Sequence, residues 1–107
     1  MTELIDDGRI SMIGPIRQEI LSGHKNTKQF ESLRNKLSAF PDLSLRTEHY
    51  EQAARYFNTC REKEVQGSHV DFLICAVAEL ENVPVFTTDR DFTRYAKHLD
   101  IQLFELR

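Results

Sequence analysis

The chain has 107 residues and a mass of 12.5 kDa, enough for one domain and too short for two ordinary ones. Hydrophobic residues make up 40% and charged residues 29%, a mix that supports a packed core and excludes a disordered or low-complexity chain. Fourteen Lys and Arg against 17 Asp and Glu give a net charge of −3, which excludes a strongly basic surface for the chain as a whole.

The first elements predicted along the chain are a strand and a helix. Residues 3–5 are interpreted as the tail of a helix or as a turn, with Gly8 just beyond the helix end. Residues 9–13 form a short strand candidate. The Gly-Pro pair at residues 14–15 ends that strand and opens a helix, because proline is favoured at the first helical position, and Gly23 ends this helix.

Two amphipathic helices are predicted in the middle of the chain. Asn26 resembles a helix cap, and apolar residues then recur at spacings of three and four from Phe30 until Pro41 ends the helix. A second helix is predicted over residues 47–64, with its apolar residues on one side and a charged, solvated end. The aromatic residues of this pair are interpreted chiefly as a core stripe, and a surface for a protein partner is the alternative.

The most apolar helix is predicted at residues 70–80, where apolar side chains cover the whole circumference, so this helix should be central and buried. Ser68 followed three residues later by Asp71 fits a capping box at its start. The remaining elements are a short strand at residues 85–87, a helix starting near Phe92 and a last strand at residues 101–104. Helices that alternate with short strands, without hairpin signals, predict a single α/β domain over residues 1–107 with a mostly parallel sheet.

Several residue types offer no functional signal. Cys60 and Cys75 are too few for a disulfide framework or a zinc site, and we interpret both as small core residues. The four histidines have no metal-ligand spacing, so each is expected to be exposed or satisfied internally. No apolar run approaches the roughly 18 residues that would span a bilayer, and we expect a cytoplasmic protein without a membrane segment.

Four acidic residues stand apart from the other charges. Glu19 follows the strand at residues 9–13, and Asp89 and Asp91 follow the strand at residues 85–87. Ligands bind beyond the carboxyl ends of strands in open α/β sheets. Asp71 lies in the first turn of the apolar helix, where a carboxylate is costly to bury without a partner. Together these carboxylates suit a hard cation such as Mg²⁺ or Mn²⁺.

A structural interpretation is available for each of these acids. Asp71 fits the acid of a capping box, and Glu19 fits a solvent-facing helix residue. Asp89 and Asp91 fit turn and helix-capping positions. Both interpretations stay open on the residues alone.

Two segments of the chain carry a resemblance to a known family. The first is ISMIGPIRQEILSG, at residues 10–23, and the second runs over residues 67–104 and contains SHVDFLICAVAELENVPVFTTDRDF. Both are similar to the PIN-domain ribonucleases, and within them to the VapC-like toxins of bacterial toxin–antitoxin pairs. The resemblance implies a PIN-like three-layer sandwich, with a mostly parallel sheet flanked by helices. It also implies that the family's first strand, which ends in an Asp, is missing from this chain.

The resemblance implies a metal-dependent endoribonuclease of toxin type that cleaves RNA phosphodiester bonds with Mg²⁺ or Mn²⁺. A cognate antitoxin and a homodimer are the protein partners it implies. The implied site consists of the catalytic metal ligands Glu19, Asp71 and Asp89, the further ligand Asp91, the supporting Thr88, and the RNA-contacting Arg17, Arg90 and Arg94.

Other interpretations remain beside this one. The chain fits a catalytically inactive PIN-like remnant that acts only by binding protein or RNA. The missing strand has three explanations: a start upstream of Met1, decay of the domain, or a strand supplied by another chain. A receiver-like signalling domain also collects acids at strand ends, but it needs a Lys after a late strand, where this sequence has Asp89.

Overall fold

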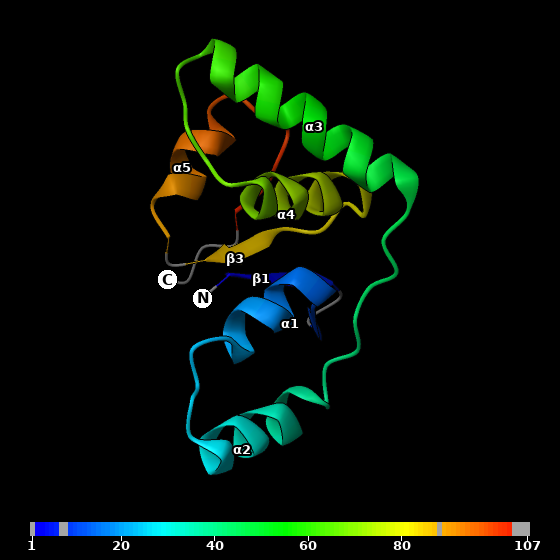
Figure 1. The fold of residues 1–107 in the computed structure, drawn as a ribbon. Helices are drawn as coiled ribbons and strands as arrows, with labels where there is room; N and C mark the ends of the chain where they lie inside the picture. Colours follow the sequence, from blue (N-terminus) through cyan, green and yellow to red (C-terminus); the bar gives the residue numbers. More distant parts are fainter. Residues whose placement is uncertain (1, 7–8, 88, 104–107) are drawn as a thin grey trace.

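The computed structural model describes residues 2–6, 9–87 and 89–103, and these form an α/β arrangement (Figure 1). Its strands are β1 (Thr2–Asp6), β2 (Arg9–Ser11) and β3 (Val85–Thr87). Its helices are α1 (Gly14–Leu21), α2 (Thr27–Leu37), α3 (Thr47–Glu62), α4 (His69–Leu80) and α5 (Asp91–Ala96). Helices α3 and α4 lie on one side of the sheet in Figure 1, and α1 and α2 lie on the other.

The central strand of the sheet is β1. The strand order is β2-β1-β3, and Leu4 of β1 pairs with Ser11 of β2 and with Val85 of β3. The expectation of a helix tail or turn at residues 3–5 is therefore wrong. Backbone groups of this segment bond to strands on both sides, which satisfies them without a helical turn. Gly8, which we expected to follow the helix, lies outside the described residues.

The described sheet is antiparallel, where we expected a mostly parallel one. Asp6 pairs with Arg9, so only two residues connect β1 to β2, whereas a parallel pair needs a crossover of about a dozen residues or more. Within residues 9–103 as described, parallel pairing is confined to two isolated bridges, Met12 with Asp42 and Val85 with Leu103. The last strand expected at residues 101–104 is reduced to the second of these bridges, and residue 104 lies outside the description.

The helix starts agree with the sequence because their expected caps form. Pro15 lies in the first turn of α1, and Gly23 beyond its end has a φ of +90°, a conformation that favours glycine. The Asn26 side chain accepts hydrogen bonds from the backbone N–H groups of Lys28 and Gln29, at 2.9 and 3.2 Å. These bonds satisfy donors that the first turn of α2 leaves open.

Helices α2 and α3 end earlier than predicted. Helix α2 ends at Leu37, before Pro41 is reached. Helix α3 ends at Glu62, and Glu64 just beyond it has a φ of +60°, which no helix continues through. The Val65 N–H then bonds back to the Cys60 carbonyl at 2.7 Å, which turns the chain toward α4.

Helix α4 is the centre of the core, as its apolar circumference predicts. It packs against α3 on one side and against β3 on the other (Figure 1). All seven residues from 72 to 78 are buried. The buried core residues outside α4 include Ile13, Tyr56, Val85, Phe92 and Tyr95. No helix among the described residues has both the length and the apolar character needed to cross a bilayer.

The cysteines and the buried histidine have structural roles, as expected. Cys60 and Cys75 are 0% exposed, and burial raises the pKa of both thiols. His49 is 1% exposed; its Nδ1 accepts from the Arg46 N–H at 2.9 Å, and its Nε2 lies 2.8 Å from Glu81 Oε1. Because Nδ1 accepts, the proton sits on Nε2, which donates to Glu81.

Candidate metal centre

Three aspartates converge at one end of the packed part of the molecule. Asp71 lies in the first turn of α4, Asp89 lies beyond the end of β3, and Asp91 is the first residue of α5. Each offers one carboxylate oxygen within 4.8 Å of the others. Asp89 is exposed, whereas Asp71 and Asp91 are partly buried. The convergence arises because β3 runs alongside α4 and α5 then starts next to the first turn of α4.

Asp71 is held by the start of its helix and by a tyrosine. Its backbone N–H donates to the Ser68 hydroxyl at 3.1 Å, which is the capping contact expected. Its Oδ2 accepts a hydrogen bond of 2.8 Å from the hydroxyl of Tyr95, a residue that is 0% exposed. Burial and this bond to Asp71 raise the pKa of Tyr95, so the phenol stays protonated and remains a donor.

Asp89 and Asp91 form a turn at the start of α5. The Asp89 N–H donates to Thr87 Oγ1 at 3.0 Å, and the Asp91 N–H donates to Asp89 Oδ1 at 2.9 Å. Asp91 is the first helical residue and Arg90 occupies the cap position. Asp89, rather than Asp91 as considered from the sequence, therefore accepts the backbone bond at this helix start, because its side chain precedes the first open N–H groups.

The donor set of this cluster fits Mg²⁺ or Mn²⁺. All three groups are carboxylates, the ligands that hard divalent cations prefer. An ionised carboxylate has about four lone-pair positions, so the bond that each aspartate makes to the protein leaves oxygen positions for a cation. Two oxygens on opposite sides of one Mg²⁺ lie about 4.2 Å apart, close to the 4.8 Å within which the three oxygens fall.

Two other residues of the predicted site do not belong to the cluster found among the described residues. Glu19, which is among the described residues, is exposed on α1 and does not belong to the three-aspartate cluster. Helix α1 lies across the sheet from α4 (Figure 1). Thr88, the predicted supporting residue, lies outside the described residues.

The three arginines considered for RNA contact have different surroundings. Arg17 donates to Asp42 Oδ1 and to the Leu37 carbonyl, each at 3.0 Å, and also to the Phe40 carbonyl. These bonds tie α1 to the segment after α2, so its guanidinium is engaged inside the protein.

The other two arginines lie beside the cluster. Arg94 pairs with Asp91 Oδ1 at 2.5 Å across one turn of α5, and it is 53% exposed. Arg90 is exposed at the start of the same helix. Both therefore remain at the solvent side of the metal centre.

Sequence reasoning missed one residue of this centre, Tyr95. Its position fits the apolar face of α5, and its ring does pack against Phe72 and Phe92 at centroid distances of 5.0 and 5.1 Å. Its hydroxyl, however, reaches Asp71, which is 24 positions earlier in the chain. The sequence offers one indication of such a contact. A tyrosine on a buried helix face needs a hydrogen-bond partner for its hydroxyl, but the sequence does not say which residue that partner is.

The fold and the cluster define an α/β protein that gathers carboxylates where a strand ends. The model of the PIN domain family matches residues 2–98 of the chain. The chain therefore belongs to the PIN domain family, whose members are generally nucleases and typically bind Mg²⁺ or Mn²⁺ through acidic residues. The match includes all three clustered aspartates. No curated protein matches the chain.

Proposed function

We propose that this protein is a metal-dependent endoribonuclease of the toxin type, which cleaves RNA phosphodiester bonds with Mg²⁺ or Mn²⁺. The observation that carries this proposal is the convergence of Asp71, Asp89 and Asp91, which come from separate elements of a PIN domain. Glu19 is proposed as a further metal ligand, and Thr88 as a supporting polar group.

Asp71, Asp89 and Asp91 would hold the Mg²⁺ or Mn²⁺ ion, which would lower the pKa of a water molecule and offset charge on the scissile phosphate. The chain's own residues have defined parts beside it. Tyr95 holds one oxygen of Asp71, so the carboxylate cannot rotate freely. Asp89 fixes the start of α5 and thereby the position of Asp91. Arg90 and Arg94 bring positive charge to the solvent side, where the RNA backbone would approach.

The toxin type implies two protein partners, a cognate antitoxin and a second copy of this chain. Tyr50 of α3 and Leu80 of α4 are large hydrophobic side chains that are 54% and 42% exposed, which is consistent with contact to another protein. Size-exclusion chromatography with light scattering tests the homodimer directly, because a dimer doubles the mass of 12.5 kDa.

A second candidate function is binding without cleavage. It is favoured by the internal partners of the cluster, since Tyr95 already bonds Asp71 and Arg94 already pairs with Asp91. It is also favoured by the position of Glu19 outside the cluster. In this case the protein binds RNA or a partner protein, and the acids serve the fold.

Cleavage of labelled single-stranded RNA separates the two functions. The purified chain should cleave RNA with Mg²⁺ or Mn²⁺ and stop when the metal is chelated. Asp71→Asn should lower the rate by about 100-fold or more. Mutation of a residue that only hydrogen-bonds to a metal ligand already costs about 10- to 100-fold in activity, and loss of the ligand itself should cost at least as much. Asp100→Asn, a change at an exposed acid outside the cluster, is the matched control and should leave the rate unchanged. Cleavage by Asp71→Asn at the normal rate would remove this residue from the site.

Metal binding itself is measured without RNA. Mg²⁺ or Mn²⁺ should raise the melting temperature of the chain, since a ligand that binds only the folded state stabilises it. Asp71→Asn and Asp89→Asn should each reduce this rise, and Asp100→Asn should not. No rise at millimolar metal would mean that the three aspartates do not hold the ion in this chain.

A further inference from the structure

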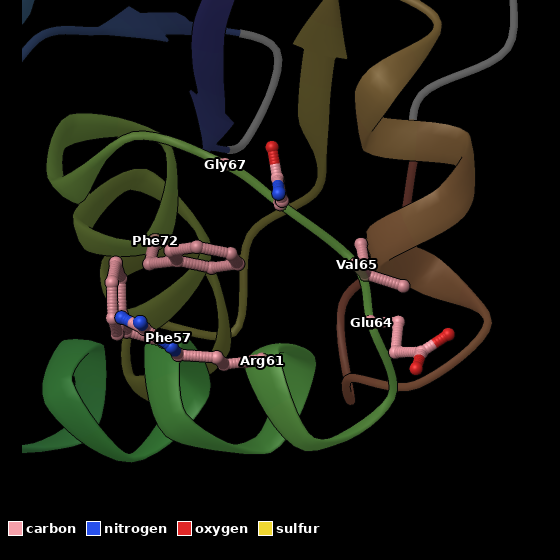
Figure 2. A pocket seen from close by; sticks show the side chains of 7 residues that line it. Phe57, Arg61, Glu64, Val65, Gly67 and Phe72 are labelled. Carbon is pink, nitrogen blue, oxygen red and sulfur yellow. The ribbon is translucent and has the colours of Figure 1, made fainter.

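Beside the metal centre lies a cavity of about 560 Å³, within the range of roughly 300–1,000 Å³ typical of small-ligand sites. It opens between the end of α3, the segment that leads to α4, and the first turn of α4 (Figure 2). The residues labelled around it are Phe57, Arg61, Glu64, Val65, Gly67 and Phe72. The proposed metal chemistry does not use this cavity.

One wall of the cavity is aromatic. The Phe57 ring stacks on His69 with centroids 4.8 Å apart and an interplanar angle of 14°. It meets Phe72 edge to face at 5.7 Å and 85°. The His69 stack and the Phe72 contact fix the plane of the Phe57 ring. A fixed, partly exposed ring of this kind offers a flat surface on which an unpaired nucleobase can stack.

The same wall carries a cation. The Arg61 guanidinium lies over the Phe57 ring, with Cζ 5.9 Å from the ring centroid. Arg61 is exposed, so this charge is available to a ligand at the cavity mouth. A guanidinium matches the geometry of a phosphate and also stacks on planar groups. Ring and guanidinium together present what one nucleotide needs, a surface for its base and a charge for its phosphate.

Gly67, which lines the cavity, packs against Tyr95 of the metal centre. A Cβ added at Gly67, which lines the cavity, would overlap the Tyr95 hydroxyl and would lie 2.9 Å from Phe72 Cζ. The same hydroxyl bonds Asp71 Oδ2 at 2.8 Å. Gly67 and the phenol group of Tyr95 therefore lie between the cavity and a proposed metal ligand, Asp71. Glycine at position 67 is what permits this close approach.

We propose that this cavity binds one unpaired nucleotide of the RNA substrate, next to the phosphodiester that is cut. Arg61, which is exposed, turns away from the Phe57 ring to bind an adjacent phosphate, and the base takes its place against the ring. The inference rests on the proposed nuclease function, because the metal centre fixes where the scissile phosphate lies. The subsite favours single-stranded RNA, since a base held in a duplex cannot enter the cavity.

The first test measures binding of a short, labelled single-stranded RNA by fluorescence anisotropy, without divalent metal and in the Asp71→Asn background. Phe57→Leu keeps an apolar side chain but removes the ring, and we expect a loss of affinity of about tenfold. Tyr50→Leu, which removes an exposed ring from the same helix outside the cavity, is the control and should bind as before. Melting temperatures show whether each variant is folded.

The second test changes an exposed residue, Arg61, so its result does not depend on the packing of the hydrophobic core. Arg61→Gln should flatten the slope of log affinity against log salt concentration by about 0.7, the effect of one lost phosphate contact on a single strand. Arg55→Gln, two positions before Phe57 and so on roughly the opposite side of α3, with its side chain bonded to Gln52, should leave the slope unchanged. A changed slope for Arg61→Gln alone supports the subsite even where Phe57→Leu is unstable.

The outcomes separate this inference from the proposed function. Affinity and salt slope that are equal for the cavity variants and their controls would overturn the nucleotide subsite, whether or not the protein cleaves RNA. No binding of single-stranded RNA by the parent protein would also overturn it. Weaker binding by the cavity variants, in a protein that shows no metal-dependent cleavage, would instead support the subsite and reject the nuclease.

Discussion

The part of the chain from α3 to α5 buries its apolar residues more completely than the part from α1 to α2. Helix α4 alone has seven buried residues, whereas α1 contributes only Ile16 and α2 only Leu37. In Figure 1, α2 projects away from the sheet at the far side of α1. The two parts are joined through β1, the central strand of the sheet.

This difference in packing coincides with the arrangement of the acids. Asp71, Asp89 and Asp91 all lie in the better packed part and converge. Glu19 lies in the other part and remains outside the cluster. Precise placement of a functional side chain depends on elements whose own positions are fixed by packing. The cluster therefore lies in the part of the chain whose apolar residues are more completely buried.

The largest expected effect comes from removing a core ring in the better packed part. Phe92 is 0% exposed and packs against Tyr95, so Phe92→Ala should lower the free energy of unfolding by about 3–5 kcal/mol. Phe30→Ala, on α2 and only partly buried, should cost about 1 kcal/mol. Urea unfolding measures both. Equal losses for the two variants would mean that the two parts are packed alike.

A smaller effect is expected at the buried histidine. His49→Ala removes the acceptor of the Arg46 N–H and the donor to Glu81, and should cost about 2–3 kcal/mol. His24→Ala, at an exposed position near α2, is the control and should change stability by less than about 0.5 kcal/mol. A loss below 1 kcal/mol for His49→Ala would show that water replaces its two bonds.

Helix caps allow a direct comparison of the two parts. Ser68→Ala and Asn26→Ala each remove a side-chain acceptor at a helix start and should each cost about 1 kcal/mol of stability. Only Ser68→Ala should also weaken the melting-temperature rise with Mg²⁺, because Ser68 helps to position Asp71. Differential scanning fluorimetry with and without metal measures both effects. An equal metal response in the two variants would separate the cap of α4 from the metal centre.

The smallest effect on stability at neutral pH is expected from the ionisation of a buried phenol, that of Tyr56. Burial and the hydrogen bond that Tyr56 donates to Glu79 raise the pKa of Tyr56 above its ordinary value of 10.0. The protonated phenol is favoured in the folded state, so its contribution to stability is complete below about pH 10 and is lost as the pH rises through the folded pKa.

Urea unfolding at a series of alkaline pH values measures this decline. Tyr56→Phe cannot ionise at this position and should show a shallower decline than the parent protein. The parent and Tyr56→Phe should have the same pH dependence between pH values of about 6 and 8, where no phenol ionises. Identical alkaline profiles for the two proteins would exclude Tyr56 as a source of the decline.

The helices were predictable because their signals are local. The uninterrupted apolar residues of α4, the Asn26 and Ser68 caps and Pro15 all act within one or two turns of the chain. The positions of the helix ends were less predictable. Helix α3 ends just before Glu64, which adopts a positive φ. Glutamate rarely adopts this conformation, so the residue type did not indicate the helix end.

The sheet was predicted poorly because short strands depend on distant partners. Residues 3–5 have too little pattern to distinguish a strand from a helix tail, and their partners lie as far away as residues 85–87. One signal was overlooked. An Asp-Gly pair at residues 7–8 stands between the paired residues Asp6 and Arg9, and such a pair favours a two-residue hairpin connection.

The acid cluster was largely predictable, and its supports were not. Strand ends and a helix start indicated Asp71, Asp89 and Asp91 because these positions meet in α/β folds. The bond from Tyr95 to Asp71 and the cavity beside it depend on the relative placement of α3, α4 and α5. Long-range placement of this kind leaves no pattern in a single sequence.

The antiparallel register of β1 has a practical consequence for anyone who handles this protein. Thr2 pairs with Thr87, and Asp89 follows only two residues later, about 7 Å along the chain. Any tag or fluorophore fused ahead of Thr2 therefore emerges beside the carboxylates. If the protein acts as the proposed nuclease, a bulky affinity tag at that end would obstruct the approach of RNA, whereas a small environment-sensitive dye would report the arrival of a cation.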